Sequence, residues 1–311
     1  MERGISLLKN NGKLGFIVPN TWLYISRSKI IREFLLNKTK IYDIVELAKY
    51  IFKDAPDMVP AIIIFEKEND IKSIQKNKCR VKAIPLKGKK SEFLSGDWRI
   101  NSFVEQKVWL DNNEKIININ LDEKTLSLLQ KIEKDTSPLK KFSVVKYGIK
   151  TGDNEKYISD KKEKDNYKKC LLGRNIGRYV TNWDNKFLNY GKWLAGYREE
   201  NIEIKKILIQ YTRKLSLLRR IIATLDEKGE YYPLNSLSYV YSNSNFSDYV
   251  LLGILNSKLM NFYFANTYID IGIKPVYLVK LPIRNEIKNS DIIEKNVNTS
   301  VKNSAGLRTR S

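Results

Sequence analysis

The sequence predicts an α/β fragment of a doubly wound, Rossmann-like sheet over residues 1–70 and a mixed α+β domain over residues 131–286. In the first part, helical repeats alternate with continuous apolar runs of strand length, the pattern of buried parallel strands. After Ser137-Pro138, short apolar runs are broken by Gly and Asn, as is typical of short strands and turns. A length of 311 residues leaves room for two domains of ordinary size.

The elements of the first part follow from local patterns. Asn11-Gly12 stops a helix, Pro19-Asn20 closes a strand, and apolar residues recur at helical spacing around Phe34. In order, we expect a helix at 2–11, a strand at 14–18, a helix at 30–35, and strands at 41–47 and 61–65 joined by a loop from Tyr50 to Pro60. This order is that of a doubly wound sheet.

The remaining chain is more polar. Residues 71–130 are lysine-rich and predict a connector with weaker strands at 80–84 and 98–103 and a short helix at 126–132. In the second domain we expect strands at 144–147, 156–158, 187–190, 207–211 and 239–241, then one helix at 249–264 with Leu251, Leu252, Leu255, Leu259 and Phe262 on one face. The Asn-, Ser- and Lys-rich residues 287–311 predict a flexible tail.

The charge balance points to a polyanionic partner. The chain has 56 Lys and Arg against 35 Asp and Glu, a net charge of +21. Such an excess attracts polyanions, and nucleic acid is the usual one in the cytoplasm. A solvated basic surface without a partner is the alternative.

The scarce residue types exclude several functions. Histidine is absent, which removes Ser-His-Asp and Cys-His nucleophile systems and every His-ligated metal site. Cys79 and Cys170 cannot make a disulfide framework, so we expect a cytoplasmic protein with two free thiols. No apolar run approaches the length of a membrane span.

Short motifs in a fixed order carry a family resemblance. They include Gly-Ile-Lys-Thr-Gly-Asp-Asn at 148–154, Leu-Asn-Ser-Lys-Leu at 255–259 and Leu-Pro-Ile at 281–283. The full series covers 12–23, 31–35, 44–47, 51–55, 61–65, 145–154, 172–179, 253–259 and 278–283. It resembles the C-terminal part of TaqI-type adenine-specific (N6) DNA methyltransferases of restriction–modification systems. The order of the series, more than any one motif, makes the resemblance specific.

The resemblance implies a division of the chain. Residues 1–70 would be the C-terminal part of the methyltransferase core, 71–130 a connector, 131–286 the target-recognition (DNA specificity) domain, and 287–311 a flexible tail. Because the resemblance begins in the middle of the core, we expect a missing N-terminal methyltransferase portion, as another polypeptide, a split gene or a truncation.

The family's catalytic motifs are missing from the sequence. The family needs a glycine-rich turn near the methionine part of S-adenosylmethionine and an Asn/Asp-Pro-Pro-aromatic tetrad that orients the adenine amino group. None of the eight prolines follows Asn, Asp or Pro, and no Gly-x-Gly occurs. We therefore expect no catalytic residue and no bound cofactor in this chain, whereas the complete enzyme would use S-adenosylmethionine.

One aromatic residue is singled out by the resemblance. Phe52, followed by Lys53-Asp54-Ala55, lies where the family places the aromatic that stacks on the flipped adenine. The alternative is that Phe52 fills the core after Ile51.

The predicted DNA contacts are cationic, small polar or glycine residues. Arg174 and Arg178 are candidates for bidentate contacts to guanine, the glycines at 148–152 for close backbone approach, and the cations at 205–220 for phosphates. The full set is Lys53, Lys146, Gly148, Lys150, Thr151, Gly152, Asn154, Arg174, Arg178, Lys205, Lys206, Arg213, Lys214, Arg219 and Arg220. Structural pairing with carboxylates, a hairpin turn and a solvated face remain the alternatives.

The sequence thus predicts target recognition on double-stranded DNA for adenine-N6 methylation. A freestanding specificity subunit serving a separate methyltransferase or restriction chain is the alternative. A metal nuclease is disfavoured because Pro56-Asp57 and Glu203-Ile204-Lys205 lie far apart in the chain. An adaptor that binds no nucleic acid also stays open.

Overall fold

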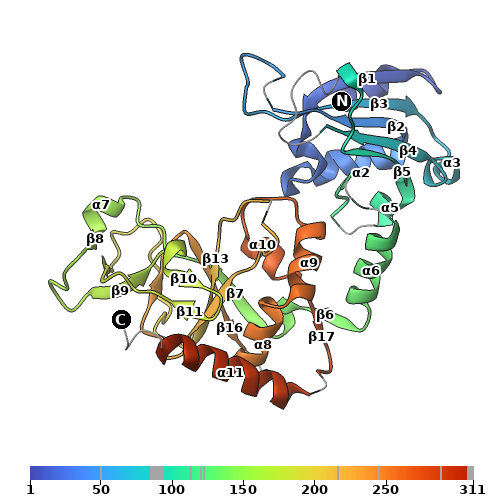
Figure 1. The fold of residues 1–311 in the computed structure, drawn as a ribbon. Helices are drawn as coiled ribbons and strands as arrows, with labels where there is room; N and C mark the ends of the chain where they lie inside the picture. The colour runs from blue at the N-terminus through green and yellow to red at the C-terminus, as the bar shows by residue number, and fades with distance from the viewer. Residues whose placement is uncertain are drawn as a thin grey trace. The chain divides into compact units, whose positions relative to one another are not determined.

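The computed structural model describes residues 1–49, 51–84, 94–111, 114–119, 121, 123–215, 217–243, 246–287 and 289–306. It divides into unit 1, Met1–Lys131, and unit 2, Ile132–Ser311 (Figure 1). Tyr50, the expected start of a loop, lies outside the described residues, as do 85–93 of the predicted connector. None of the helices in the described ranges is long and apolar enough to cross a membrane.

Unit 1, as far as it is described, is one sheet with helices. Its strands are β1 (Lys13–Pro19), β2 (Thr39–Glu46), β3 (Pro60–Lys67), β4 (Lys78–Ala83) and β5 (Ile100–Glu105). Its helices are α1 (Glu2–Leu7), η1 (Asn20–Leu23), η2 (Ser26–Ser28), α2 (Lys29–Lys38), α3 (Ile71–Gln75), α5 (Gln106–Asp111) and α6 (Glu123–Glu133), the last of which crosses the unit boundary. The strands expected at 14–18, 41–47 and 61–65 are confirmed.

The expectation of a mostly parallel sheet is wrong. The strand order is β1-β3-β2-β4-β5, and of the described pairs only β2 and β4 run in parallel. A loop without a helix joins β2 to β3, and adjacent strands connected in that way run antiparallel. The apolar run of β1 suggested a buried parallel strand, but β1 lies at the edge of the sheet, and its residues are alternately exposed and half-buried.

Part of the expected connector belongs to the sheet and core of unit 1. Cys79, Val81 and Ala83 alternate into the core from β4, while Arg80 and Lys82 between them lie on the more exposed face. Trp109 of α5 is fully buried in the same core. The weaker strands expected at 80–84 and 98–103 are confirmed as β4 and β5, whereas α5 was not expected. The polar composition concealed that they belong to the core of unit 1, because a strand with one buried face needs only every second residue to be apolar.

Unit 2 consists of short strands and five described helices. Its strands are β6 (Thr136–Pro138), β7 (Ser143–Tyr147), β8 (Ile158–Ser159), β9 (Tyr167–Leu171), β10 (Ile176–Gly177), β11 (Val180–Thr181), β12 (Phe187–Asn189), β13 (Lys206–Gln210), β14 (Ala223–Asp226), β15 (Tyr232–Pro233), β16 (Leu237–Ser242) and β17 (Pro282–Arg284). The helices are α7 (Asn154–Tyr157), α8 (Asp248–Leu255), α9 (Lys258–Thr267), α10 (Pro275–Leu278) and α11 (Ser290–Gly306), with 3-10 turns η3 (Leu139–Lys141) and η4 (Gly173–Asn175).

The strands of unit 2 form several small sheets. Within the described residues, β14-β13-β16-β7 is antiparallel throughout, and β15-β9-β12-β8 forms a second sheet with one parallel pair, β15 with β9. Two-stranded sheets join β10 to β11 and β17 to β6. Unit 2 is therefore a mixed α+β structure with several sheets, as expected.

The single helix expected at 249–264 is two helices, α8 and α9. The break falls at Asn256, whose side chain binds both the amide N (3.0 Å) and the carbonyl O (2.9 Å) of Ala223 in β14. Ser257 then caps α9 by accepting a hydrogen bond from the Met260 amide. Leu259, expected on the buried face, is exposed because of this break.

Two further expectations differ from the structure. The strand expected at 156–158 is mostly helix α7, because the Asp153 carboxylate caps it by accepting from the Lys156 amide. The prediction of a flexible tail is wrong for residues 290–306, which form α11 and pack against α8. Gly253 allows this approach, since a Cβ there would lie 2.9 Å from the Val297 side chain.

Candidate nucleic-acid interface

The loop between β2 and β3 presents an aromatic ring to solvent. Ile51 packs on the small core of Leu47, Ala48 and Ile84, whereas the next residue, Phe52, is 38% exposed. The interpretation of Phe52 as core filler therefore does not describe this structure. Lys53 is exposed beside it.

A buried polar cluster lies where this loop joins the sheet. The Asn20 amide N donates to the Val59 carbonyl (2.8 Å), and the Asn20 side chain donates to the carboxylate of Glu46 (2.8 Å). Arg99 approaches the other oxygen of Glu46 at 3.4 Å. Sequence analysis missed this cluster; its only signal was a polar residue at the end of each of two apolar strands. The cluster thus fixes the two ends of the loop that carries Phe52.

Two glycines of unit 1, Gly4 and Gly12, are packed against the protein's own atoms, whereas no atom lies within 4 Å of a Cβ built on Gly15. The family's cofactor lies against a glycine-rich turn after a strand, but β1 is followed by Asn20, and β2 by Leu47. The space above Gly4 is filled, since a Cβ there would lie 2.7 Å from the Leu14 side chain, and a Cβ on Gly12 would lie 2.8 Å from the Lys9 carbonyl.

The turn at 148–154 is built mainly by packing within the chain. Gly148 is buried, and a Cβ there would lie 2.0 Å from the Leu234 carbonyl O, so its missing side chain makes room for the protein's own backbone and not for DNA. Thr151 is also buried and donates to Asn154 Oδ1 at 2.6 Å. The assignment of Gly148 and Thr151 to DNA contacts is therefore wrong. Lys150, Gly152 (φ +89°) and Asn154 remain exposed.

Lys206, predicted to contact phosphate, is fully buried. Its ammonium donates to Asp226 Oδ2 (2.7 Å) and to the carbonyls of Ile202 (2.9 Å) and Ile204 (3.2 Å). Burial lowers the pKa of Lys206, and the facing Asp226 carboxylate opposes that shift. The predicted phosphate contact is wrong because Lys206 lies in β13, which is paired on both sides, with β14 and β16, and its side chain is enclosed there.

Three arginines of the same stretch turn toward backbone carbonyls. Arg213 Nε donates to the Arg219 carbonyl (2.9 Å), Arg219 Nη1 to the Asn256 carbonyl (3.2 Å), and Arg220 Nη2 to the Asp270 carbonyl. Arg220 is buried, and burial lowers the pKa of Arg220 and of Arg213. A phosphate contact by Arg220 is therefore excluded, and Arg213 and Arg219 are held in the loop.

The other predicted cations lie nearer the surface. Lys146 pairs with Glu200 at 3.0 Å, and Lys205 is 3.9 Å from Asp248. Lys214 is exposed. Of the stretch 205–220, the structure thus leaves Lys214 as the described cation that is most open to a phosphate.

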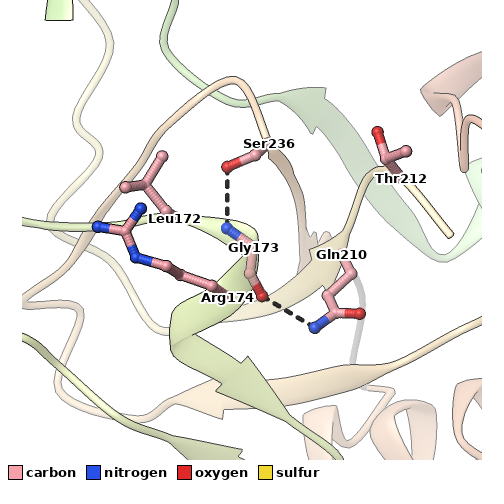
Figure 2. A pocket seen from close by; sticks show the side chains of 6 residues that line it. All are labelled: Leu172, Gly173, Arg174, Gln210, Thr212 and Ser236. Atoms are coloured by element: carbon pink, nitrogen blue, oxygen red, sulfur yellow. Dashed lines mark hydrogen bonds between the residues drawn. The ribbon is translucent and has the colours of Figure 1, made fainter.

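A pocket of about 380 Å³ opens beside η4. It is lined by Leu172, Gly173, Arg174, Gln210, Thr212 and Ser236, which come from η4, the end of β13 and the turn before β16 (Figure 2). Of this set, Leu172, Gly173 and Arg174 lie in the 172–179 motif, and only Arg174 was predicted to contact DNA. Gln210, Thr212 and Ser236 carried no motif signal, because they come from distant segments that meet here.

Hydrogen bonds within the pocket fix its wall. The Gly173 amide donates to Ser236 Oγ, and Gln210 Nε2 donates to the Gly173 carbonyl, each at 2.8 Å (Figure 2). Gln210 also donates to the Ile176 carbonyl and accepts from Arg213 Nη1 at 2.6 Å. The Gln210 amide is therefore used by the protein itself and serves as wall, not as a reader of bases.

Arg174 is the exposed charged group of the pocket. Its side chain is 63% exposed, and Nη2 donates to Asp184 Oδ2 at 3.0 Å. Burial alone would raise the pKa of Asp184, but hydrogen bonds from Asn175 and Arg174 outweigh burial and lower it. The carboxylate thus stays ionised and orients the guanidinium, whose other N–H groups can reach an outside acceptor.

The remaining candidate, Arg178, lies outside this pocket. It is exposed and stacks on the Tyr179 ring at 4.9 Å, with Tyr179 in the left-handed region (φ +66°). Within the described ranges, no group of three or more Cys, Asp and Glu side chains is arranged to hold a metal ion.

Two family models match separate parts of the chain. Residues 1–52 match the family model of the Eco57I restriction-modification methylase, and residues 168–283 match that of the TaqI-like C-terminal specificity domain. No curated protein sequence matches the chain.

Solved structures share the fold at low sequence identity. The Type IIL restriction-modification enzyme MmeI in complex with DNA is 11% identical, with 96% of this chain and 43% of that chain covered and a TM-score of 0.60. A nuclease-deletion mutant of the Type ISP enzyme LlaGI with a DNA substrate mimic is 13% identical, with 96% and 30% covered and a TM-score of 0.57. The DrdV–DNA complex is 11% identical, with 96% and 38% covered and a TM-score of 0.54.

This chain therefore spans less than half the length of these similar structures. The resemblance expected from the sequence motifs is confirmed by the two family matches, which fall in the two units separately. The chain is thus similar to restriction–modification methylases over residues 1–52 and to the TaqI-like C-terminal specificity domain over residues 168–283.

Proposed function

We propose that unit 2 recognises a target sequence in duplex DNA for site-specific adenine-N6 methylation, and that unit 1 supplies the loop that holds the flipped adenine. The observation that carries the proposal is the exposed Arg174 at the pocket within the matched specificity domain. A guanidinium is the commonest partner of guanine O6 and N7 in the major groove. Asp184 already restricts Arg174, so less conformational freedom is lost on binding.

The adenine part of the proposal depends on Phe52. Enzymes that modify a base extrude it from the duplex, and an aromatic face restores part of the lost stacking. Phe52 is exposed in the loop between β2 and β3. Asn20 holds both ends of this loop, through its side chain to Glu46 and its amide to the Val59 carbonyl. This arrangement supports a stacking role, and Lys53 beside it can meet a neighbouring phosphate.

The catalytic step would require residues that this chain does not contain. The sequence has neither the tetrad nor the glycine-rich turn. In this proposal the cofactor and the tetrad come from a further methyltransferase portion, and these residues contribute recognition and base capture.

The first test concerns DNA recognition. We expect the protein to bind duplex DNA with an affinity that falls steeply between 50 and 200 mM salt, about 10³-fold or more if six or more phosphates are contacted. Selection from a random duplex library should yield a preferred site. Arg174→Ala should then weaken binding to that site by about 1–3 kcal/mol and relax the preference at one base pair.

The matched control is Arg284→Ala, since Arg284 is also an exposed, ion-paired arginine of unit 2 but lies outside the pocket. It should leave the preferred site unchanged. An affinity that is independent of salt, or an Arg174→Ala variant with the wild-type preference, would contradict the proposal.

The second test concerns Phe52. Because its ring is exposed, Phe52→Ala should change the free energy of unfolding by less than about 1 kcal/mol. In the complete enzyme, the same change should weaken capture of the flipped adenine by about 1–3 kcal/mol, the usual value of base–aromatic stacking. Fluorescence of 2-aminopurine at the target adenine reports the flipping, and thermal melting reports the stability.

A matched variant separates stacking from packing. Phe65→Ala removes a fully buried ring from β3 and should cost about 3–5 kcal/mol of stability. If Phe52→Ala lowered the stability as Phe65→Ala does, with an unchanged fluorescence signal, Phe52 would be a packing residue.

A further inference from the structure

In the loop between β13 and β14, leucines are exposed to solvent and arginines turn toward the protein, the opposite of the usual arrangement. In this segment, residues 211–222, Leu218 is 96% exposed, and Leu215 and Leu217 are 46% and 41% exposed. Surface loops usually expose cations and bury leucines. Here the three arginines Arg213, Arg219 and Arg220 turn inward instead, onto backbone carbonyls, and the leucines face solvent.

The inward cations make the loop a fixed platform. Arg213 links the two sides of the loop through the Arg219 carbonyl, and its own amide donates to the Ile271 carbonyl at 2.9 Å. On the outgoing side, the Ile221 amide donates to Asn261 Oδ1 at 2.7 Å. A turn at the tip is closed by the Leu217 amide, which donates to the Lys214 carbonyl at 3.2 Å. The leucines are thus held outward by a hydrogen-bonded base.

The surroundings of the loop indicate what covers the leucines. The loop continues directly from Gln210 and Thr212, which line the pocket of Arg174. Residues 204–225 contain no Asp or Glu, and Lys214 is exposed next to Leu215. A polyanion can therefore approach this side without repulsion from the segment itself.

The size of the apolar surface favours DNA over a protein partner. A stable protein interface buries about 800 Å² on each partner, far more than three leucines of one short loop provide. One or two apolar side chains, in contrast, are what proteins insert between base pairs to unstack a step of a duplex.

We propose that Leu218, supported by Leu215 and Leu217, acts as a wedge that enters a base step of duplex DNA next to the site read by Arg174. This inference rests on the proposed DNA recognition. Lys214 contacts the phosphate beside the opened step. The hydrogen bonds from the arginines to backbone carbonyls keep the loop rigid, so that the base step opens and the loop does not deform.

The test is a measurement of DNA unwinding. A side chain inserted between base pairs unwinds the duplex, so the wild-type protein, bound to a relaxed closed-circular plasmid and treated with a topoisomerase, should shift the topoisomer distribution. Leu218→Ala should abolish this shift. The variant should keep the wild-type melting temperature, and its binding to a linear fragment of the same plasmid should keep the wild-type salt dependence. Leu218→Met, which stays apolar and long, should retain the shift.

Leu259→Ala is the matched control, because Leu259 is a leucine of the same unit that is 56% exposed in α9, away from this loop. It should leave the shift unchanged. If the wild type binds the fragment but shifts no topoisomers, or if Leu218→Ala shifts them equally, the wedge is disproved and the DNA-recognition proposal stands. If the wild type does not bind the fragment, the proposed function itself fails. A wild-type dimer that Leu218→Ala dissociates would assign the loop to self-association and also disprove the wedge.

Discussion

Replacing Lys206 by methionine is expected to lower the free energy of unfolding by about 3–5 kcal/mol, the range for breaking one side of a buried ion pair. The change leaves the buried Asp226 carboxylate without its counter-charge and removes the ammonium donor from the carbonyls of Ile202 and Ile204, of which Ile202 still accepts from the Ile204 amide at 2.9 Å. The amides of Glu230 and Tyr231 still donate to Asp226, so a residual anchor remains. Urea unfolding followed by circular dichroism measures the loss.

Lys205→Met provides the matched control for this prediction. Lys205 is the neighbouring residue, but it is 37% exposed and 3.9 Å from Asp248, so its removal should cost less than about 1 kcal/mol. Where both variants are folded, Lys206→Met should bind duplex DNA with the wild-type salt dependence, because its ammonium is not open to phosphate. Equal stability of the two variants, with a weaker salt dependence for Lys206→Met, would restore the phosphate role.

The second large effect is expected for Gly148→Ala. A Cβ would lie 2.0 Å from the Leu234 carbonyl O and 2.7 Å from the Leu237 carbonyl O. Both contacts are backbone, and the Gly148 amide is itself bonded to the Leu237 carbonyl at 2.9 Å, so no side-chain movement can relieve the clash. The junction of β7 with β16 must open, at a cost of about 3 kcal/mol or more.

Gly177→Ala is the comparison, since its Cβ would meet only the Val180 Cβ at 3.7 Å, an ordinary contact. It should change the stability by less than about 1 kcal/mol. Thermal melting of both variants measures the two losses of stability. A Gly148→Ala protein that melts like the wild type but binds DNA weakly would mean that this glycine approaches DNA.

The sequence by itself determined where the strands of unit 1 and several longer elements of unit 2 lie. Apolar runs located β1, β2 and β3, because a strand that packs on a core must be apolar over its whole local length or on every second residue. The ordered motifs placed Phe52 in a loop, and the structure exposes it there. Such features are encoded within a few residues of each other, which is why they could be predicted.

Only the tertiary structure decided how those elements pair and which cations face solvent. The order β1-β3-β2 depends on partners distant in sequence, so the antiparallel pairing could not be read from one strand. Six cations between 205 and 220 looked alike in the sequence, yet Lys206 lies against Asp226 and Arg220 against the Asp270 carbonyl. A buried cation is stabilised only by a partner brought from elsewhere in the chain, and local sequence does not show that partner.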